Sequence, residues 1–385
     1  MTERLSASEL VALVRRVFSP TPEDRRLAIL IDLPDEERPD RPEWRARREL
    51  ARDWAAMLAD HAQDLGLEAV DLVLYRNVHA NNADLPATAV VHEGGPLPAD
   101  AAGMKGTPVR FDELFRTYRI LIAPTEFSAT APLKMAARAH GFRAATMPGF
   151  SASMIPALRL DYGVIGRRCE RFKKLLDDAV RCDLVFAAGD CRHELTLDLR
   201  HRTATASGGV FPNPGMAGNL PSGETYIVPY EGERGGDPSA SAGELPVQLG
   251  EEVVVYRVEG NRAVEVLTRG PAAEAEARRL AEEPAYGNLA ELGLGVLADF
   301  GLQATGELLL DEKLGLHIAF GRSDHFGGQV GPRQFSRPDR VVHIDRVYTD
   351  SIQPRVRVAG AVLTMSDGRR VELMRDGRYV VVLDG

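Results

Sequence analysis

Three of the chain's nine histidines lie between residues 317 and 345. The runs LHIAFG and VVHID at the two ends of this segment have the composition of short strands, in which residues two apart project from the same face. His343 and Asp345 are therefore expected to point together, and His317 can join them from a neighbouring strand. Two imidazoles and a carboxylate form a common set of metal ligands. For any one of these histidines alone, a hydrogen-bonded position in the core is the alternative.

Two glutamates stand in unusually apolar or glycine-rich surroundings. Glu224 opens the apolar run in NLPSGETYIVP, and Glu291 lies inside the Leu, Ala and Gly run of YGNLAELGLG. Burying an unpaired carboxylate is costly, so each is expected to meet a cation, a metal ion or several hydrogen-bond donors. For either glutamate alone, a place on the surface is the alternative.

The elements that position these residues change in kind along the chain. Strand-like apolar runs alternate with helical patterns in the first half, the strands at 27–34, 69–76, 119–124 and 143–149 and the helices at 42–66, 130–140 and 163–181. Such alternation predicts an α/β domain with a mostly parallel sheet. From about residue 183, short β-type runs separated by Gly and Pro turns take over. We therefore expect an α/β domain over 1–183 and a β-rich α+β domain, which carries the metal ligands, over 184–385.

Composition excludes several classes of function. A net charge of -9 argues against nucleic-acid binding, which requires a concentrated basic face. The first residues lack the apolar core of a secretory signal, and no window approaches the length of a membrane span, so a cytoplasmic location is expected. The three cysteines lack CxxC spacing, which argues against a disulfide framework or a zinc knuckle. Neither a GxGxxG nor a Walker A sequence marks the α/β half as nucleotide-binding.

Taken together and in this order, NLPSGETYIVP, AELGLG, GLHIAFG and VVHID resemble the thermophilic metallo-aminopeptidases, the aminopeptidase T or AmpS-type leucyl aminopeptidase family. The resemblance covers the C-terminal domain, whereas the N-terminal half matches only as a similar α/β pattern. It implies a homodimer and two divalent ions, zinc, cobalt or manganese, held by Glu224, Glu291, His317, His343 and Asp345. Such ions activate a water and polarise the scissile carbonyl, and Glu224 or Glu291 is expected to serve as general base.

The sequence departs from this family at one position. Its peptidases carry a tyrosine seven residues after the histidine of the H-x-A-x-G motif, where this chain has Asp324 followed by His325. His325 is a candidate catalytic residue that donates to a developing oxyanion. The alternatives are that it binds a substrate carboxylate together with Arg322, or that it caps a turn.

A related branch, the 2,5-dihydroxypyridine dioxygenases, supplies a second hypothesis. By resemblance to that branch, His317, His343 and Asp345 would bind a single ferrous ion as a facial triad. The presence of Glu224 and Glu291 favours two metal ions, because a mononuclear iron site has no need of two further carboxylates. A non-catalytic binding protein with a vestigial site is the third class.

The sequence thus predicts a metal-dependent hydrolase, an aminopeptidase or amidase acting on small peptides or modified amino acids. It predicts neither a nucleic-acid nor a membrane partner. Two further residues are weighed: Glu126 as a ligand of a substrate amine or as a helix cap or surface acid, and Tyr348 as a core residue or a second site candidate.

Overall fold

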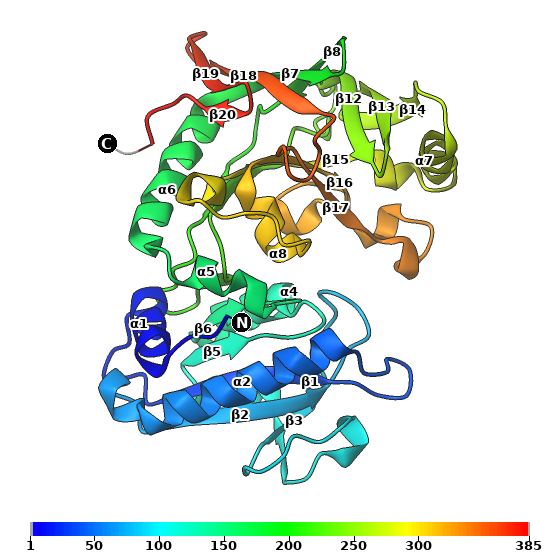
Figure 1. Cartoon of the computed structure of the whole chain (residues 1–385). Helices are drawn as coiled ribbons and strands as arrows, with labels where there is room; N and C mark the ends of the chain where they lie inside the picture. The colour runs from blue at the N-terminus through cyan, green and yellow to red at the C-terminus, as the bar shows by residue number, and fades with distance from the viewer. Residues whose placement is uncertain (1–2, 384–385) are drawn as a thin grey trace. The chain divides into compact units, whose positions relative to one another are not determined.

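The structure is a computed structural model that describes residues 3–383. The chain forms two compact units, one built from Met1–Gly163 with Gly209–Ser222 and the other from Val164–Gly208 with Gly223–Gly385 (Figure 1). Among the described residues, no helix combines the length and the apolar character that crossing a membrane requires.

The first unit is built on a seven-stranded sheet in the order β10-β6-β5-β1-β2-β3-β4. Its parallel strands are β1 (Arg26–Leu33), β2 (Ala69–Arg76), β5 (Ile120–Ala123), β6 (Arg143–Thr146) and β10 (Ala217–Asn219). The edge pair β3 (Thr88–Val91) and β4 (Pro108–Arg110) runs antiparallel. In β1 every residue after Arg26 is buried, as expected of a parallel strand covered on both faces. The predicted α/β class with a mostly parallel sheet is confirmed.

Helices of the first unit begin and end at recognisable signals. They are α1 (Ala7–Phe18), α2 (Pro42–Asp60), α3 (Phe111–Thr117), α4 (Thr130–His140) and α5 (Ile155–Leu158). The Ser6 side chain and Glu9 form a capping box at the start of α1. Pro42 occupies the first turn of α2, and Gly141 takes a left-handed conformation after α4.

The strand order of this sheet reverses at β1, which lies between β2 and β5, and doubly wound sheets bind ligands beyond the carboxyl ends of the strands at such a point. At the carboxyl end of β1, groups of the chain itself pair with one another. There the buried Asp32 carboxylate accepts hydrogen bonds from the backbone N–H groups of Glu126 (2.8 Å) and Phe127 (3.0 Å). Glu126 in turn pairs with the guanidinium groups of Arg41 and Arg47. The Glu126 carboxylate therefore has two cationic partners, and its binding of a substrate amine stays a prediction.

The second unit contains two antiparallel sheets. The larger has the order β14-β13-β12-β8-β7-β18-β19-β20, and the smaller β17-β16-β15-β11-β9. The larger comprises β7 (Ala179–Ala188), β8 (Cys191–Asp198), β12 (Ala242–Leu249), β13 (Glu252–Glu259), β14 (Arg262–Val266), β18 (Arg357–Met365), β19 (Arg370–Arg375) and β20 (Arg378–Tyr379). The smaller comprises β9 (Thr205–Ser207), β11 (Glu224–Ile227), β15 (Leu289–Gly295), β16 (Leu316–Gly321) and β17 (His343–Val347). The helices are α6 (Tyr162–Asp178), which begins two residues before this unit, α7 (Pro271–Glu282) and α8 (Leu308–Asp311). The β-rich α+β class is confirmed.

The units divide at other places than between residues 183 and 184. Most of α6 belongs to the second unit, where the Thr225 hydroxyl donates to the carbonyl of Cys169 (2.7 Å) and the ring of Phe172 lies 4.7 Å from that of Tyr379. The chain also returns to the first unit over 209–222, because β10 extends the parallel sheet beside β6. A change from helical to strand-like composition marks the end of α6, and the division between the units falls near the start of that helix.

Candidate metal centre

Four neighbouring strands of the smaller sheet carry all five expected ligands on one face. Each ligand lies opposite a glycine or alanine of the adjacent strand: Glu224 faces Gly295, His317 faces Gly293, Glu291 and Asp345 face Ala319, and His343 faces Gly321. Directly opposed residues in an antiparallel pair project from the same face, so a small residue there leaves room for its larger partner. The alternation of small residues in ELGLG and HIAFG thereby opens the space into which the ligands point.

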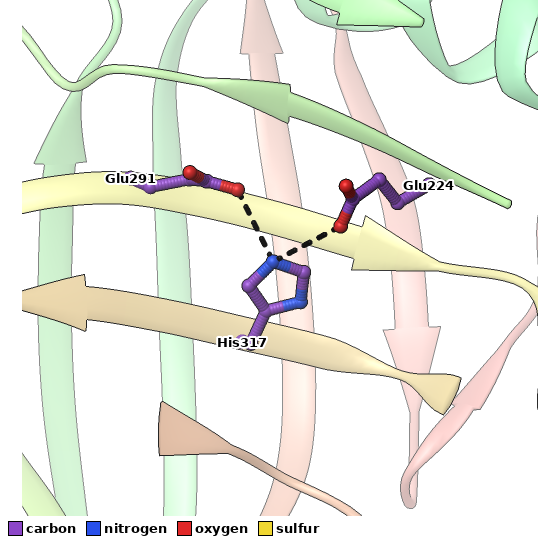
Figure 2. A group of neighbouring side chains, drawn as sticks. All are labelled: Glu224, Glu291 and His317. Carbon is purple, nitrogen blue, oxygen red and sulfur yellow. Dashed lines mark hydrogen bonds and ion pairs between the residues drawn. The ribbon is translucent and has the colours of Figure 1, made fainter. Parts of the chain in front are cut away.

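The first group of donors joins Glu224, Glu291 and His317. Their potential ligand atoms all lie within 4.8 Å of one another. The Nε2 atom of His317 is 3.2 Å from Oε1 of Glu291 and 3.5 Å from Oε2 of Glu224 (Figure 2). All three residues are buried. A cation placed among these atoms would meet one imidazole and two carboxylates.

The second group joins Glu291, His343 and Asp345, again with ligand atoms within 4.8 Å of one another. The Nε2 atom of His343 is 3.4 Å from both Oε2 of Glu291 and Oδ1 of Asp345. Glu291 therefore belongs to both groups, with Oε1 toward His317 and Oε2 toward His343. A carboxylate placed in this way can bridge two cations, one in each group.

Backbone carbonyls orient both imidazoles. The Nδ1 atom of His317 lies 3.1 Å from the carbonyl oxygen of Gly315, and that of His343 lies 2.8 Å from the carbonyl oxygen of Arg322. A carbonyl only accepts, so each Nδ1 carries the proton and donates it. Once the Nε2 proton leaves, each ring offers the lone pair of Nε2 to a cation among the carboxylates, which is the arrangement found in metal-ligating histidines.

Two local features show that these residues fit a cation. Oε2 of Glu224 is buried and has no hydrogen-bond partner among residues 3–383, although it lies within 4 Å of an imidazole. A Cβ atom at Gly293 would lie only 1.9 Å from Nε2 of His317, so only glycine at this position leaves space for the imidazole ring. A buried, unpartnered carboxylate oxygen is costly in a folded protein unless a ligand compensates it.

The charges of the centre also favour a cation. Burial alone lowers the pKa of an imidazole, but the hydrogen bond to Glu291 and the charges of Glu291, Glu224 and Asp345 outweigh it and raise the pKa of His317 to about 9. For His343, the effects of Asp345 and Glu291 likewise overcome burial and raise its pKa well above the ordinary value. Burial raises the pKa of Glu291, but hydrogen bonds from the two imidazoles leave it below its usual value. The carboxylates thus attract positive charge strongly, which protons supply when no metal ion does.

The chain resembles known proteins in part of its sequence and in its fold. No protein-family model matches the sequence. Aminopeptidase T of Thermus aquaticus is 31% identical over 179 residues, which are 42% of this chain and 40% of that protein. The alignment therefore spans two fifths of the curated relative's length.

Two solved structures match nearly the whole chain. AmpT from Thermus thermophilus matches with a TM-score of 0.57 and 17% identity over 97% of this chain and 98% of its own. The chain has the aminopeptidase T fold. The same fold appears in 2,5-dihydroxypyridine dioxygenase from Pseudomonas putida KT2440, which matches with a TM-score of 0.62 and 13% identity over 98% of this chain and 99% of its own.

The centre of this aminopeptidase T fold includes two residues that the sequence analysis missed. Lys313 is fully buried, and its Nζ lies 2.7 Å from Oε1 of Glu224 and contacts the carboxylate of Glu312. Burial raises the pKa of Glu312 to about 8, with further contributions from the charges of Glu224 and Asp345 against that of Lys313. Two carboxylates thus share one lysine. In the sequence, DEKLG has the composition of a surface charge run, and only its position directly before β16 hints at burial.

The structure places His325 beside the centre. Its ring centroid is 5.6 Å from that of His343, and its Nδ1 is 3.4 Å from Oδ1 of Asp324. Burial and the nearby charges of His343 and Arg322 lower the pKa of His325 to about 4, so the ring is neutral at neutral pH. A neutral imidazole here can donate a hydrogen bond, and its catalytic role remains a prediction. Arg322 pairs with Asp324 (2.6 Å), so its guanidinium already has a carboxylate partner.

Tyr348 is a core residue, as the sequence favoured. It is 4% exposed, and its hydroxyl donates to the carbonyl of Pro246 (2.9 Å). Of the three cysteines, Cys169 and Cys182 are buried, whereas Cys191 is exposed.

Proposed function

We propose that the chain is a metal-dependent hydrolase of the aminopeptidase type, acting on small peptides or modified amino acids. The observation that carries the proposal is the division of the Glu291 carboxylate between two donor groups, one with Glu224 and His317 and the other with His343 and Asp345. This is the donor set of a dinuclear centre with a bridging carboxylate. The partial sequence match to aminopeptidase T of Thermus aquaticus supports the same chemistry.

The chain's own residues prepare such a reaction. Two bound cations would supply a water of lowered pKa and would polarise a substrate carbonyl. His317 and His343 offer Nε2 because backbone carbonyls hold their Nδ1 protons. Lys313 holds one oxygen of Glu224 and leaves the other directed toward His317. The neutral ring of His325 is available to donate to a developing oxyanion, and Glu224 or Glu291 is proposed as general base.

A mononuclear iron dioxygenase is the second candidate, favoured by the match to 2,5-dihydroxypyridine dioxygenase over nearly the whole chain. Its proposed triad would be His317, His343 and Asp345. Among the described residues, however, His317 groups with Glu224 and Glu291, whereas His343 and Asp345 form the other group. The donor geometry therefore supports the hydrolase more strongly.

Metal content and turnover test the proposal together. We expect about two zinc, cobalt or manganese ions per chain by elemental analysis, together with hydrolysis of aminoacyl-nitroanilides. His343→Ala and Asp345→Ala should each remove metal and turnover from a folded chain, whereas Asp339→Ala, at an exposed acid on the preceding segment, should change neither. One iron per chain with oxygen uptake on dihydroxypyridines would establish the dioxygenase instead. Failure to bind any divalent ion would contradict both.

A homodimer and a cytoplasmic location stay predictions. Light scattering coupled to size-exclusion chromatography tests the first, and cell fractionation tests the second.

A further inference from the structure

A buried carboxylate outside the ligand set accepts hydrogen bonds from the loop beside the centre. Glu231, four residues after β11, has a side chain that is 5% exposed. Its Oε1 accepts hydrogen bonds from the Ser323 hydroxyl (2.5 Å) and from Nδ2 of Asn288 (2.8 Å). Its Oε2 accepts from the backbone N–H of Gln329 (2.5 Å). The Glu231 carboxylate therefore accepts hydrogen bonds from residues near both ends of the loop of residues 322–330.

Hydrogen bonds between Ser323 and Val330 also join the two ends of this loop. The Ser323 hydroxyl also accepts from the backbone N–H of Val330 (3.2 Å), and the Ser323 N–H donates to the Val330 carbonyl (2.8 Å). At Gly328 an added Cβ would lie 2.2 Å from the Ser323 hydroxyl and 3.0 Å from Oε1 of Glu231. The close approach of these three residues leaves the loop little freedom while Glu231 is in place.

This loop contacts His343 in two ways. The carbonyl of Arg322 accepts the Nδ1 proton of His343 (2.8 Å), and the rings of His325 and Phe326 lie 5.6 and 5.2 Å from the His343 ring. The other imidazole, His317, is held by the carbonyl of Gly315, which lies outside the loop. A displacement of residues 322–330 would therefore release one imidazole and leave the other in place.

We infer that Glu231 is a positioning residue for His343: by fixing residues 322–330, it holds the Arg322 carbonyl where it sets the orientation and tautomer of that imidazole. The inference rests on the proposed metal centre. Outer partners of ligating histidines typically change metal affinity by about 10- to 100-fold when they are lost. The effect should be larger for the ion held by His343 and Asp345 than for the ion held by His317 and Glu224.

The test compares Glu231→Gln with Glu233→Gln. Glu233 pairs with the same Arg202 that approaches Glu231, so the control makes the same charge change two residues away without touching the loop. Cobalt(II) titration followed by visible absorption measures the two ions separately. We expect Glu231→Gln to weaken one cobalt ion about 10- to 100-fold and to alter its absorption band, with a smaller change at the other ion, which shares Glu291, and none in the Glu233→Gln protein.

A second readout needs no metal. In chelator-treated protein with ¹⁵N-labelled histidine, the Nδ1–H signal of His343 should broaden or shift in Glu231→Gln, while that of His317 stays. Ser323→Ala removes a loop contact at constant charge and should act in the same direction if Glu231→Gln does not fold. Unchanged cobalt binding and an unchanged His343 signal would overturn the inference. Equal loss at both ions and both imidazoles would also overturn it, because Glu231 would then only stabilise the unit. If the wild-type protein binds no cobalt, the proposed function fails, and the imidazole signals still decide whether Glu231 orients His343.

Discussion

Replacing Gly293 by alanine should displace His317 from the metal centre. The added Cβ would lie 1.9 Å from Nε2 of His317, whereas ordinary contact begins at 3.4 Å, so the ring must retreat by about 1.5 Å. Metal–ligand distances tolerate only about 0.2 Å. We therefore expect Gly293→Ala to weaken the ion held by His317 and Glu224 by at least about 100-fold, or ~2.7 kcal/mol.

Gly360→Ala is the matched control. Gly360 is also a strand glycine of the second unit, but its added Cβ would meet nothing closer than the Met374 carbonyl at 3.9 Å. Zinc or cobalt titration calorimetry on both variants measures the affinities, and urea unfolding of chelated protein should show a cost of about 1–3 kcal/mol for Gly293→Ala. Two ions bound to Gly293→Ala with wild-type affinity would refute the argument that this glycine makes room for a ligand.

Two further predictions concern charge. The pKa of His317 in the folded protein, about 9, lies above its ordinary 6.5, so in chelated protein the stability contributed by its proton is complete below about pH 6.5 and is lost as the pH rises through about 9. Zinc affinity should instead rise as the pH approaches 9, because the proton must leave Nε2 of His317 before that atom can bind a metal ion. Urea unfolding midpoints measure the stability across this pH range, and zinc titrations measure the affinity. A zinc affinity independent of pH would contradict the protonated imidazole. Lys313→Met should destabilise chelated protein by about 3–5 kcal/mol, because Glu224 and Glu312 lose their buried counter-charge, and saturating zinc should restore part of that loss. Lys173 forms a partly exposed ion pair with Asp177, so Lys173→Met should change the free energy of unfolding by less than about 1 kcal/mol. Equal effects of the two lysine variants would contradict a larger contribution from the buried charge of Lys313.

The sequence predicted those parts of the site that depend on local strand geometry. His343 and Asp345 project from one face because they are two residues apart in β17. The approach of Glu224 and Glu291 to His317 depends on the order and register of strands far apart in the chain, which periodicity does not encode. Their grouping was expected only from the resemblance of four motifs to a known family.

Other features were missed for specific physical reasons. Lys313 and Glu312 lie in a run whose charges suggest exposure, and their burial follows from the fold around them. Gly293 and Ala319 look like ordinary small residues until cross-strand pairing shows which ligand each one faces. The return of residues 209–222 to the parallel sheet is a tertiary contact without a mark in composition, so the sequence does not predict it.

The shared carboxylate of Glu291 would make metal binding at the two donor groups interdependent. The two oxygens of Glu291 are bonded to the same carbon atom, so a rotation of the carboxylate that improves its contact with an ion beside His317 would also move the oxygen that faces His343. A first bound ion would therefore fix the orientation of the Glu291 carboxylate for a second, and would neutralise charge that the second would otherwise meet. The two ions should bind in successive steps with unequal dissociation constants. The selectivity of one donor group for a metal should depend on the ion that occupies the other group.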